Sequence, residues 1–280
     1  RALNNVNQIE GTITMNIWLR YNWNDPRLAW NKSEWNNISS LAFNTHPETD
    51  GIWVPDIYIY NTGETPMSEL DYSRAVVNNK GDILWSRPGL IKSTCLFDLN
   101  LFPYDTQNCH LKFGSWSYHG RDLCLLTATP DIDTSNYKDN EEWRLIDYNS
   151  HVNIKYYSCC PEPYYDITFN YSITRKPGYY NMNIILPTFA TATLIIMTLF
   201  IPWDSGERIS FAVTVMLAIV VYLLILSENL PKSNQRPLLS EMIIGLTMFS
   251  LLGVFFTILI SAINSYEENE ANEDNEDNEE

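Results

Sequence analysis

Three long apolar runs in the second half of the chain constrain its fold most strongly. They cover residues 183–201, 209–226 and 242–262, and each is about as long as a helix must be to cross the hydrocarbon core of a bilayer. Within that core a backbone can satisfy its hydrogen bonds only in a helix or a closed barrel. Any one run could be a buried core helix, but three in succession with short polar links predict a membrane domain. We place this domain at residues 179–265, with helices over 179–202, 208–229 and 238–264.

The parts before and after the membrane domain differ from it in composition. Residues 1–178 alternate short apolar and polar runs and are rich in Trp, Tyr, Asn and turn residues, which is typical of a strand-rich domain in water. Residues 266–280 are acidic: positions 267–280 hold nine acidic residues and no basic one, out of a net charge of −16 for the chain. Such a run favours a disordered, solvated segment and argues against nucleic-acid binding.

The chain has five cysteines, Cys95, Cys109, Cys124, Cys159 and Cys160. Four can pair, and we expect the fifth to be Cys124, a small buried hydrophobe on a strand. Cys95 and Cys109 enclose thirteen residues, and a disulfide closing such a loop would stabilise the fold by roughly 3 kcal/mol. Cys159 and Cys160 are adjacent in YYSCCPEPYY, where a bond would close a strained ring. Two buried thiols or half of a metal site are the alternatives for this pair.

Three Asn-X-Ser sequons, at Asn31, Asn37 and Asn170, are compatible with glycosylation in the secretory pathway. Together with the membrane runs they indicate an oxidising, extracellular environment for the first domain. We therefore expect a multi-pass plasma-membrane glycoprotein whose N-terminal domain is extracellular and whose residues 266–280 are cytoplasmic. No signal peptide is visible in RALNNVNQIE, so we expect the sequence to be part of a longer product.

A set of motifs occurs in a distinctive order along the chain. They are NIWLRYNWND (16–25), WVPDIYIYN (53–61), the Cys95–Cys109 loop with FPYD, KFGSWSYHG (112–120), the adjacent cysteines and DSGERIS (204–210). In these motifs the sequence resembles the Cys-loop pentameric ligand-gated ion channels, most closely nicotinic acetylcholine receptor subunits of alpha type. The resemblance implies an extracellular β-sandwich ligand-binding domain followed by an all-α transmembrane helix bundle. The family's N-terminal helix and fourth membrane helix have no counterpart here.

The resemblance also implies an agonist pocket between subunits. The principal face would supply Tyr60, Trp116, Tyr157 and Tyr164, with a vicinal Cys159–Cys160 disulfide at the tip of a hairpin that closes over the agonist. The neighbouring subunit would supply Trp18, and the segment 76–86 would line the far side with Val76, Leu84 and Ser86. Aromatic faces suit a quaternary ammonium ion, which has no hydrogen to donate, at roughly 0.5–2 kcal/mol per cation–π contact.

In the second apolar run, six residues recur at spacings of 4, 3, 4, 3 and 4 and therefore share one helical face. They are Ser210, Thr214, Leu217, Val221, Leu224 and Glu228. A helix–helix seam explains the apolar three, but polar groups at membrane depth are costly unless they face water or partners. Five copies around an axis would give polar rings, apolar rings able to gate by dewetting, and an acidic ring. Glu207, just before the run, adds a second acidic ring, so we predict a cation-selective pore.

For coupling, the resemblance implies that the Cys95–Cys109 loop presses through Phe102 and Pro103 on the link at 229–237. Arg175 matches a family arginine that pairs with an acidic residue on an amino-terminal loop. An ungapped alignment puts Gln8 at that position, whereas a slip of two residues would bring Glu10 there.

We therefore predict a subunit of a neurotransmitter-gated cation channel, opened by acetylcholine or a similar cationic amine, in a homo- or hetero-pentamer at a postsynaptic membrane. Its other partners would be the lipid bilayer and permeant cations. Two alternatives stay open: a membrane-tethered binder of choline-like cations that does not conduct, and an orphan or silent subunit with another ligand. Catalysis is not expected, because the four histidines stand apart and the sequence has no nucleophile elbow, zinc-like CxxC pair or phosphate loop. We expect no metal and no cofactor.

Overall fold

The structure is a computed structural model that describes residues 2–46, 51–62, 73–128, 132–202, 207–232 and 234–279. The chain divides into two compact units, one made of Arg1–Phe97 and Thr106–Thr174, the other of Asp98–Asp105 and Arg175–Glu280. The first unit therefore ends near the predicted boundary at 178. The second unit also takes in part of the Cys95–Cys109 loop, which sequence position alone assigned to the first domain.

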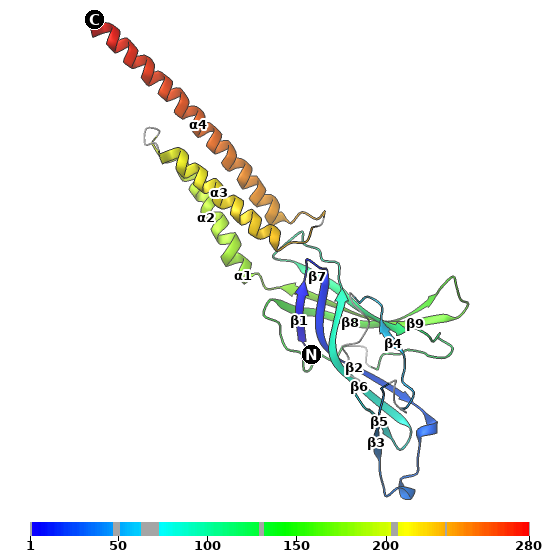
Figure 1. Ribbon diagram of the computed structural model, residues 1–280. Coiled ribbons are helices and arrows are strands. Elements are labelled where there is room, and N and C mark those ends of the chain that lie inside the picture. Colours follow the sequence, from blue (N-terminus) through cyan, green and yellow to red (C-terminus); the bar gives the residue numbers. More distant parts are fainter. Residues whose placement is uncertain are drawn as a thin grey trace. The chain divides into compact units, whose positions relative to one another are not determined.

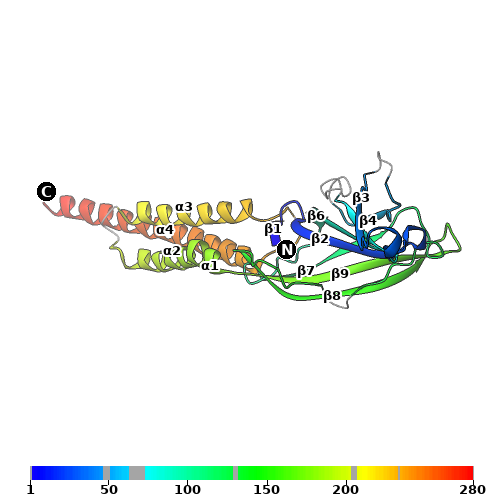
Figure 2. The same cartoon turned by 90° about the horizontal axis from the view of Figure 1, so that it is seen from below.

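Among the described residues, nine strands form the first unit. They are β1 (Ala2–Asn7), β2 (Thr12–Asn24), β3 (Ser40–Phe43), β4 (Ile57–Ile59), β5 (Ala75–Asn78), β6 (Asp82–Thr94), β7 (Thr106–Ser115), β8 (Trp143–Tyr156) and β9 (Pro163–Arg175). Two short 3-10 turns, η1 (Pro26–Leu28) and η2 (Lys32–Glu34), lie between β2 and β3. The strands form a five-stranded sheet in the order β1-β2-β6-β5-β3 and a four-stranded sheet in the order β4-β7-β9-β8 (Figures 1 and 2). The predicted β-sandwich is confirmed.

The sandwich follows from the period-two pattern of its strands. Along β6 the buried side chains of Ile83 and Trp85 alternate with outward ones, and together with Ala75 and Val77 of β5 they form a core cluster. Tyr21 of β2 lies opposite Trp85 in register, with ring centroids 5.3 Å apart. Each such large apolar side chain contributes about 1.5–3 kcal/mol when fully buried, so these alternating positions fix which face of each strand turns inward.

The second unit contains the helices. They are α1 (Gly178–Tyr180), a π-helical turn η3 (Asn181–Ile185), α2 (Leu186–Met197), a 3-10 turn η4 (Thr198–Phe200), α3 (Glu207–Glu228) and α4 (Leu238–Glu279). The π turn ends two residues before Pro187, which has no N–H to donate to the preceding turn. Helices α2, α3 and α4 lie side by side (Figures 1 and 2).

Three stretches of these helices among the described residues are long and apolar enough to cross a membrane: Gly178–Met197, Glu207–Glu228 and Leu238–Glu267. Hydroxyl groups in them bond to their own backbone, as expected where water is absent. Thr188, for example, donates to the carbonyl of Ile184 at 2.7 Å, and Thr257 donates to that of Gly253 at 2.8 Å.

Two segments differ from expectation. Helix α4 continues to Glu279, through the acidic residues for which composition favoured disorder, and the abundant Glu there has a high helix propensity. Cys124 is exposed and lies outside the strands, so the prediction of a buried strand residue is wrong. Around it Leu123 and Leu125 are more buried while Cys124 and Leu126 are exposed, so Cys124 occupies an outward position of this extended segment.

Candidate functional site: an aromatic cluster, a loop cluster and a helix face

Tyr60 and Trp116 lie together at the ends of β4 and β7, which pair directly. The Tyr60 N–H donates to the carbonyl of Lys112 at 2.7 Å, and its hydroxyl donates to the carbonyl of Ser115 at 2.7 Å. Gly114 makes this possible, because a Cβ there would collide with the Tyr60 hydroxyl. The Tyr60 ring therefore lies directly against the backbone of β7.

Asp56 of the WVPD motif fixes the turn that carries Trp116. One of its carboxylate oxygens accepts a hydrogen bond from the Ser115 hydroxyl at 2.5 Å, and the other accepts from the Ser117 N–H at 2.7 Å. The Trp116 indole projects with 74% of its surface exposed, and its centroid lies 6.5 Å from Tyr60 and 6.3 Å from Tyr58, both edge-on. The indole thus leaves much of its surface free for a ligand.

Tyr157 and Tyr164 flank the turn between β8 and β9, with ring centroids 5.5 Å apart. Burial, followed by the nearby phenols of Tyr157 and Tyr164 and the carboxylates of Asp166 and Asp56, raises the pKa of Tyr60 to about 12. The Tyr60 phenol is therefore neutral at physiological pH. The four aromatic residues predicted for the principal face come together in one cluster.

Cys159 and Cys160 lie in the turn between Tyr157 and Tyr164 as separate thiols. The Cys160 N–H donates to the Tyr157 carbonyl at 3.2 Å, and the adjacent Cys160 thiol, ahead of burial, raises the pKa of Cys159. The structure thus contains the tight turn expected at the hairpin tip but not the vicinal bond, which stays a prediction.

A buried ion pair borders the aromatic cluster. The Lys112 ammonium lies 3.0 Å from a carboxylate oxygen of Asp166 and 5.6 Å from the centroid of the Tyr60 ring. Asp166 also accepts hydrogen bonds from the Asn153 amide at 2.7 Å and the Thr168 hydroxyl at 3.2 Å. Burial would raise the pKa of Asp166, but the bonds from Asn153 and Lys112 outweigh it and hold that pKa below its ordinary value.

Trp18 lies elsewhere, on the outer face of the five-stranded sheet, where 45% of its surface is exposed. Leu84 and Val76, which pair in register, also point outward on that sheet. A shallow, open groove of about 450 Å³ lies beside them and is lined by Asn22, Trp23, Val76, Asn78, Asp82, Ile83 and Leu84. Within one chain Trp18 and this groove therefore belong to a different sheet from Trp116.

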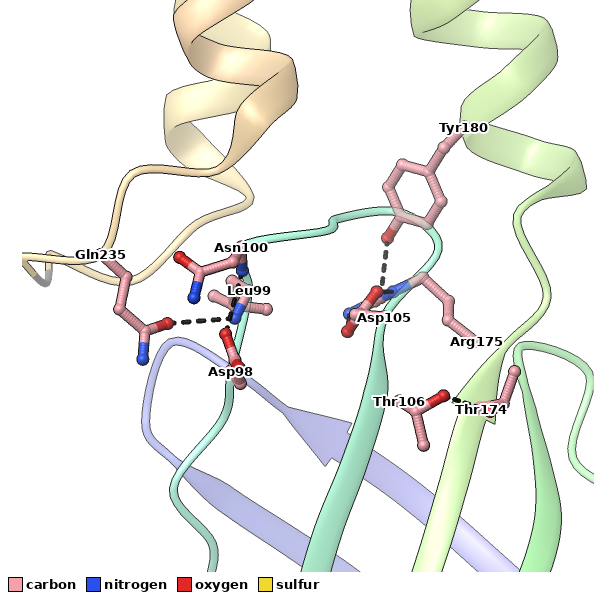
Figure 3. Close-up of polar contacts among 9 residues, drawn as sticks. All are labelled: Asp98, Leu99, Asn100, Asp105, Thr106, Thr174, Arg175, Tyr180 and Gln235. Carbon is pink, nitrogen blue, oxygen red and sulfur yellow. Dashed lines mark hydrogen bonds and ion pairs between the residues drawn. The ribbon is translucent and has the colours of Figure 1, made fainter.

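In the second unit, the segment Asp98–Asp105 of the disulfide loop bonds to the link before α4 (Figure 3). The Cys95–Cys109 disulfide is formed, with its Cα atoms 5.4 Å apart. The Leu99 N–H donates to the Gln235 side-chain oxygen at 3.0 Å, and the Leu238 N–H donates to the Asn100 carbonyl at 3.0 Å. The predicted contact between loop and link thus runs through Leu99 and Asn100.

Phe102 packs against Tyr180 and Arg175, and its contact with the link stays a prediction. Its ring meets that of Tyr180 edge-on at a centroid distance of 4.8 Å, and the Arg175 guanidinium lies 4.8 Å from the Phe102 centroid. The Phe102-Pro103 peptide is cis, as the sequence allowed.

Arg175 forms a buried ion pair that the sequence analysis did not predict, and a partner on the amino-terminal loop stays a prediction. Its guanidinium donates to both carboxylate oxygens of Asp105, at 2.8 and 3.1 Å, and to the Tyr180 hydroxyl at 3.4 Å (Figure 3). Glu10, one of the two candidates from the amino-terminal loop, instead pairs with Lys92 at 3.4 Å. The carboxylate of the FPYD motif lies close to Arg175 because β7 and β9 pair in register through Thr106 and Thr174, and these residues directly adjoin Asp105 and Arg175.

On α3, all seven predicted pore residues are exposed: Glu207, Ser210, Thr214, Leu217, Val221, Leu224 and Glu228. The buried residues of the same helix, Ala212, Val215, Ile219 and Leu226, lie on another face. The packing of helices within one chain therefore leaves the predicted pore face uncovered.

Comparison with protein families identifies both units. Residues 1–177 match the model of the neurotransmitter-gated ion-channel ligand binding domain, and residues 184–278 match that of the neurotransmitter-gated ion-channel transmembrane region. The chain belongs to the neurotransmitter-gated ion-channel family. This is a family of receptors and not of enzymes.

Relatives of this channel-family chain include three acetylcholine receptor subunits. Neuronal acetylcholine receptor subunit alpha-6 of Homo sapiens is 33% identical over 259 residues, which are 92% of this chain and 52% of that protein. Acetylcholine receptor subunit alpha-type acr-16 of Caenorhabditis elegans is 36% identical over 252 residues, 90% and 47% respectively. Neuronal acetylcholine receptor subunit alpha-2 of Gallus gallus is 32% identical over 249 residues, 89% and 46%. The chain spans about half the length of these relatives.

Several residues of this channel-family chain were missed by sequence reasoning: Asp56, Lys112, Gly114, Asp166 and Asp105. Lys112 and Gly114 stand in the same KFGSW motif as Trp116, and Asp56 and Asp105 stand in WVPD and FPYD, so the motifs were the available signal. Their roles depend on which strands pair, which a motif does not state.

The three sequons lie in different settings. Asn37 is exposed in a turn with φ of 57°, Asn31 caps η2 by accepting from the Ser33 N–H, and the Asn170 amide donates to Asn149 at 2.9 Å. Glycosylation at all three positions stays a prediction. Among the described residues there is no group of three or more His, Cys, Asp or Glu side chains that could hold a metal ion.

Proposed function

We propose that this chain is part of a subunit of a pentameric, neurotransmitter-gated cation channel of the plasma membrane, opened by acetylcholine or a similar cationic amine. The observation that carries the proposal is the cluster of Tyr60, Trp116, Tyr157 and Tyr164 around a largely exposed indole. The acetylcholine receptor subunits among its relatives support the ligand class.

The chemistry of the cluster suits a quaternary ammonium ion. Such an ion offers no N–H, so its binding energy must come from ring faces and from exclusion of water. Tyr60 stays neutral because of its raised pKa, and its hydroxyl is already engaged with Ser115, so its ring rather than its oxygen is available to the cation. The hairpin tip with Tyr157 and Tyr164 would cover the bound cation.

A neighbouring copy would complete the site. Trp18, Val76 and Leu84 lie on the outer face of the other sheet, where a single chain gives them no role in its own aromatic cluster. In a ring of subunits, the groove beside them would face the next subunit's cluster. Symmetric oligomers commonly build sites between unlike faces in this way.

The exposed face of α3 supports a conducting pore over a tethered binder. Five copies of this face would line an axis with Ser210 and Thr214, then the apolar Leu217, Val221 and Leu224. Acidic rings from Glu207 and Glu228 would border the pore at both ends of the helix and favour cations. In a simple membrane anchor, ionisable groups on an uncovered helix face would cost free energy without any compensating contact.

Gating would require the bound agonist to bias one of two states of the chain. Strand β9 begins at the aromatic cluster with Tyr164 and ends at Arg175, which is bonded to Asp105 of the disulfide loop. That loop in turn holds Gln235 and Leu238 at the start of α4. Movement of the hairpin would therefore act on the pore helices through these bonds.

Binding measurements on Trp116 variants test the pocket. Trp116→Ala should weaken the binding of acetylcholine by about 2- to 30-fold, because it removes a cation–π face worth roughly 0.5–2 kcal/mol. Trp116→Phe should lose less. Trp35→Ala removes another exposed indole, outside the cluster, and should leave binding unchanged. Equal affinity of Trp116→Ala and the unaltered protein would mean that the pocket lies elsewhere.

A further inference from the structure

The sequon asparagine Asn37 lies in a tight turn that also carries an exposed tryptophan. The Ile38 N–H donates to the Trp35 carbonyl at 3.0 Å, and φ is positive at both residues between them, 50° at Asn36 and 57° at Asn37. These are features of a type I′ turn, in which asparagine is favoured because it tolerates positive φ. Trp35 and Asn37 are therefore two residues apart within one tight turn.

Hydrogen bonds hold this turn on both sides. The N–H groups of Trp35 and Asn37 both donate to the Lys32 carbonyl, at 3.1 and 2.9 Å. After the turn, the Trp30 indole donates to the Ile38 carbonyl at 2.9 Å. The Trp35 indole nevertheless is 61% exposed, so it offers an apolar surface on a fixed backbone beside Asn37. A surface that is already ordered loses little entropy when another group packs on it.

The side-chain amides of the other two sequon asparagines are engaged, whereas that of Asn37 is not. The Asn31 amide donates to Glu34 at 2.9 Å, and the Asn170 amide donates to Asn149 at 2.9 Å. Within the part of the chain that the structure describes, the exposed side chain of Asn37 forms no hydrogen bond. A sugar on its nitrogen therefore replaces no existing contact.

We propose that Asn37 carries an N-linked glycan whose first sugar stacks on the Trp35 indole and stabilises this turn. Transfer from a lipid-linked oligosaccharide diphosphate in the secretory pathway joins the Asn37 side-chain nitrogen to the anomeric carbon of the first N-acetylglucosamine. The bond from that carbon to the diphosphate breaks, the nitrogen loses one of its two protons, and the lipid diphosphate leaves with the bonding electrons. The inference is independent of the agonist pocket and requires only that residues 1–178 are extracellular.

The chemistry of the two groups favours stacking. One face of the sugar ring presents axial C–H groups with small positive partial charges, and the face of an indole is negative. Cα atoms two residues apart are separated by at most about 7.6 Å, so the first sugar on Asn37 can reach the Trp35 ring. Stacking removes apolar surface of both partners from water, which favours the folded form of the turn.

The test uses Ser39→Ala, because Ser39 is the third residue of this sequon and its replacement leaves Asn37 in the turn. Ser39→Thr keeps the sequon and is the matched control. Both are made in the whole protein, with and without Trp35→Ala, expressed in eukaryotic cells and placed in lipid nanodiscs. Glycopeptide mass spectrometry should find Asn37 occupied in the unaltered protein and in Ser39→Thr.

Thermal unfolding of the strand unit then measures the stacking. Ser39→Ala should lower its melting temperature by about 2–4 °C, the size expected for one modest contact in a domain of this length. The same change should have no measurable effect in the Trp35→Ala background, because the two substitutions remove one shared contact. An unmodified Asn37, an unchanged melting temperature, or an equal loss in both backgrounds would overturn the inference.

Enzymatic treatment of the folded protein gives a second measurement that needs no sequon variant. Trimming each glycan to its first sugar should leave the melting temperature unchanged, because that sugar makes the contact. Complete removal should lower it by about 2–4 °C more in the unaltered protein than in Trp35→Ala, which loses any glycans at Asn31 and Asn170 as well. A loss already complete after trimming would assign the stabilisation to the outer sugars and refute stacking on Trp35.

Discussion

At the scale of single residues, Arg175 and Asp105 form a fully buried ion pair. Both side chains are 1% exposed, and two hydrogen bonds join them. Burying two charges is costly, so such a pair adds little net stability, but removing one partner leaves an unpaired buried charge at a cost of about 3–5 kcal/mol. The Arg175 guanidinium also lies over the rings of Phe102 and Tyr180. This pair therefore holds the disulfide loop to the first helix.

We expect Arg175→Glu to abolish or strongly reduce agonist-evoked current, because it places two carboxylates together in this buried site. Asp105→Asn should reduce the current less, since the amide can still accept a hydrogen bond from the guanidinium. Whole-cell recording, normalised to protein at the cell surface, measures both. Normal currents from Arg175→Glu would show that the pair has no part in gating.

Asp166 gives a pH prediction with a definite sign. Its folded-state pKa lies below its ordinary value, so its bonds stabilise the fold above about pH 4 and are lost as pH falls through the lower, folded-state pKa. Asp166→Asn should lower the melting temperature at neutral pH and should flatten the loss of stability on acidification. Glu141→Gln, at an exposed position, is the matched control. The measurement is the melting temperature from pH 7 to pH 3. If it fell as steeply on acidification in Asp166→Asn as in Glu141→Gln, the account would be contradicted.

At the scale of elements, some features of the candidate site could be predicted from the sequence and others could not. The predicted pore face of α3 belongs to the first kind, and the ion pair of Arg175 with Asp105 belongs to the second. The pore face was predictable because an α-helix repeats every 3.6 residues, so residues three and four apart share a face, and because polar residues are conspicuous in an apolar run. The partner of Arg175 was not, because it depends on the register of β7 against β9, which no local pattern encodes. The setting of Cys124 was misjudged because it was inferred from cysteine pairing alone: an unpaired cysteine is commonly a buried hydrophobe, but the number of cysteines says nothing about local strand formation.

Cysteine substitution along α3 tests whether the predicted pore face lines a water-filled pore. Cysteines at Leu217, Val221 and Leu224 should react from water with a charged thiol reagent and block the current, because these positions would line the pore. Cysteines at the buried positions Val215 and Ile219 should not react. The readout is irreversible block after brief exposure to the reagent, and a pattern without the 3- and 4-residue spacing would refute the pore assignment.

At the scale of the whole molecule, the chain consists of two compact units, one built of strands and the other mainly of helices. Hydropathy and the period-two pattern predict a domain boundary at residue 178, and the first compact unit ends at Thr174. The membership of segment 98–105 in the helical unit was not predictable from composition, since that segment is tied to Tyr180, Asn181 and Gln235 by individual contacts.

The central claim, that an aromatic cation pocket opens a cation-selective pore, is tested most directly by the reversal potential of an acetylcholine-evoked current in voltage-clamped cells expressing the protein. In sodium-rich solution the current should reverse near 0 mV, and replacing external sodium by a large impermeant cation should shift the reversal by tens of millivolts in the negative direction. A reversal potential that followed chloride, or the absence of current from a surface-expressed pentamer that binds acetylcholine, would contradict the account.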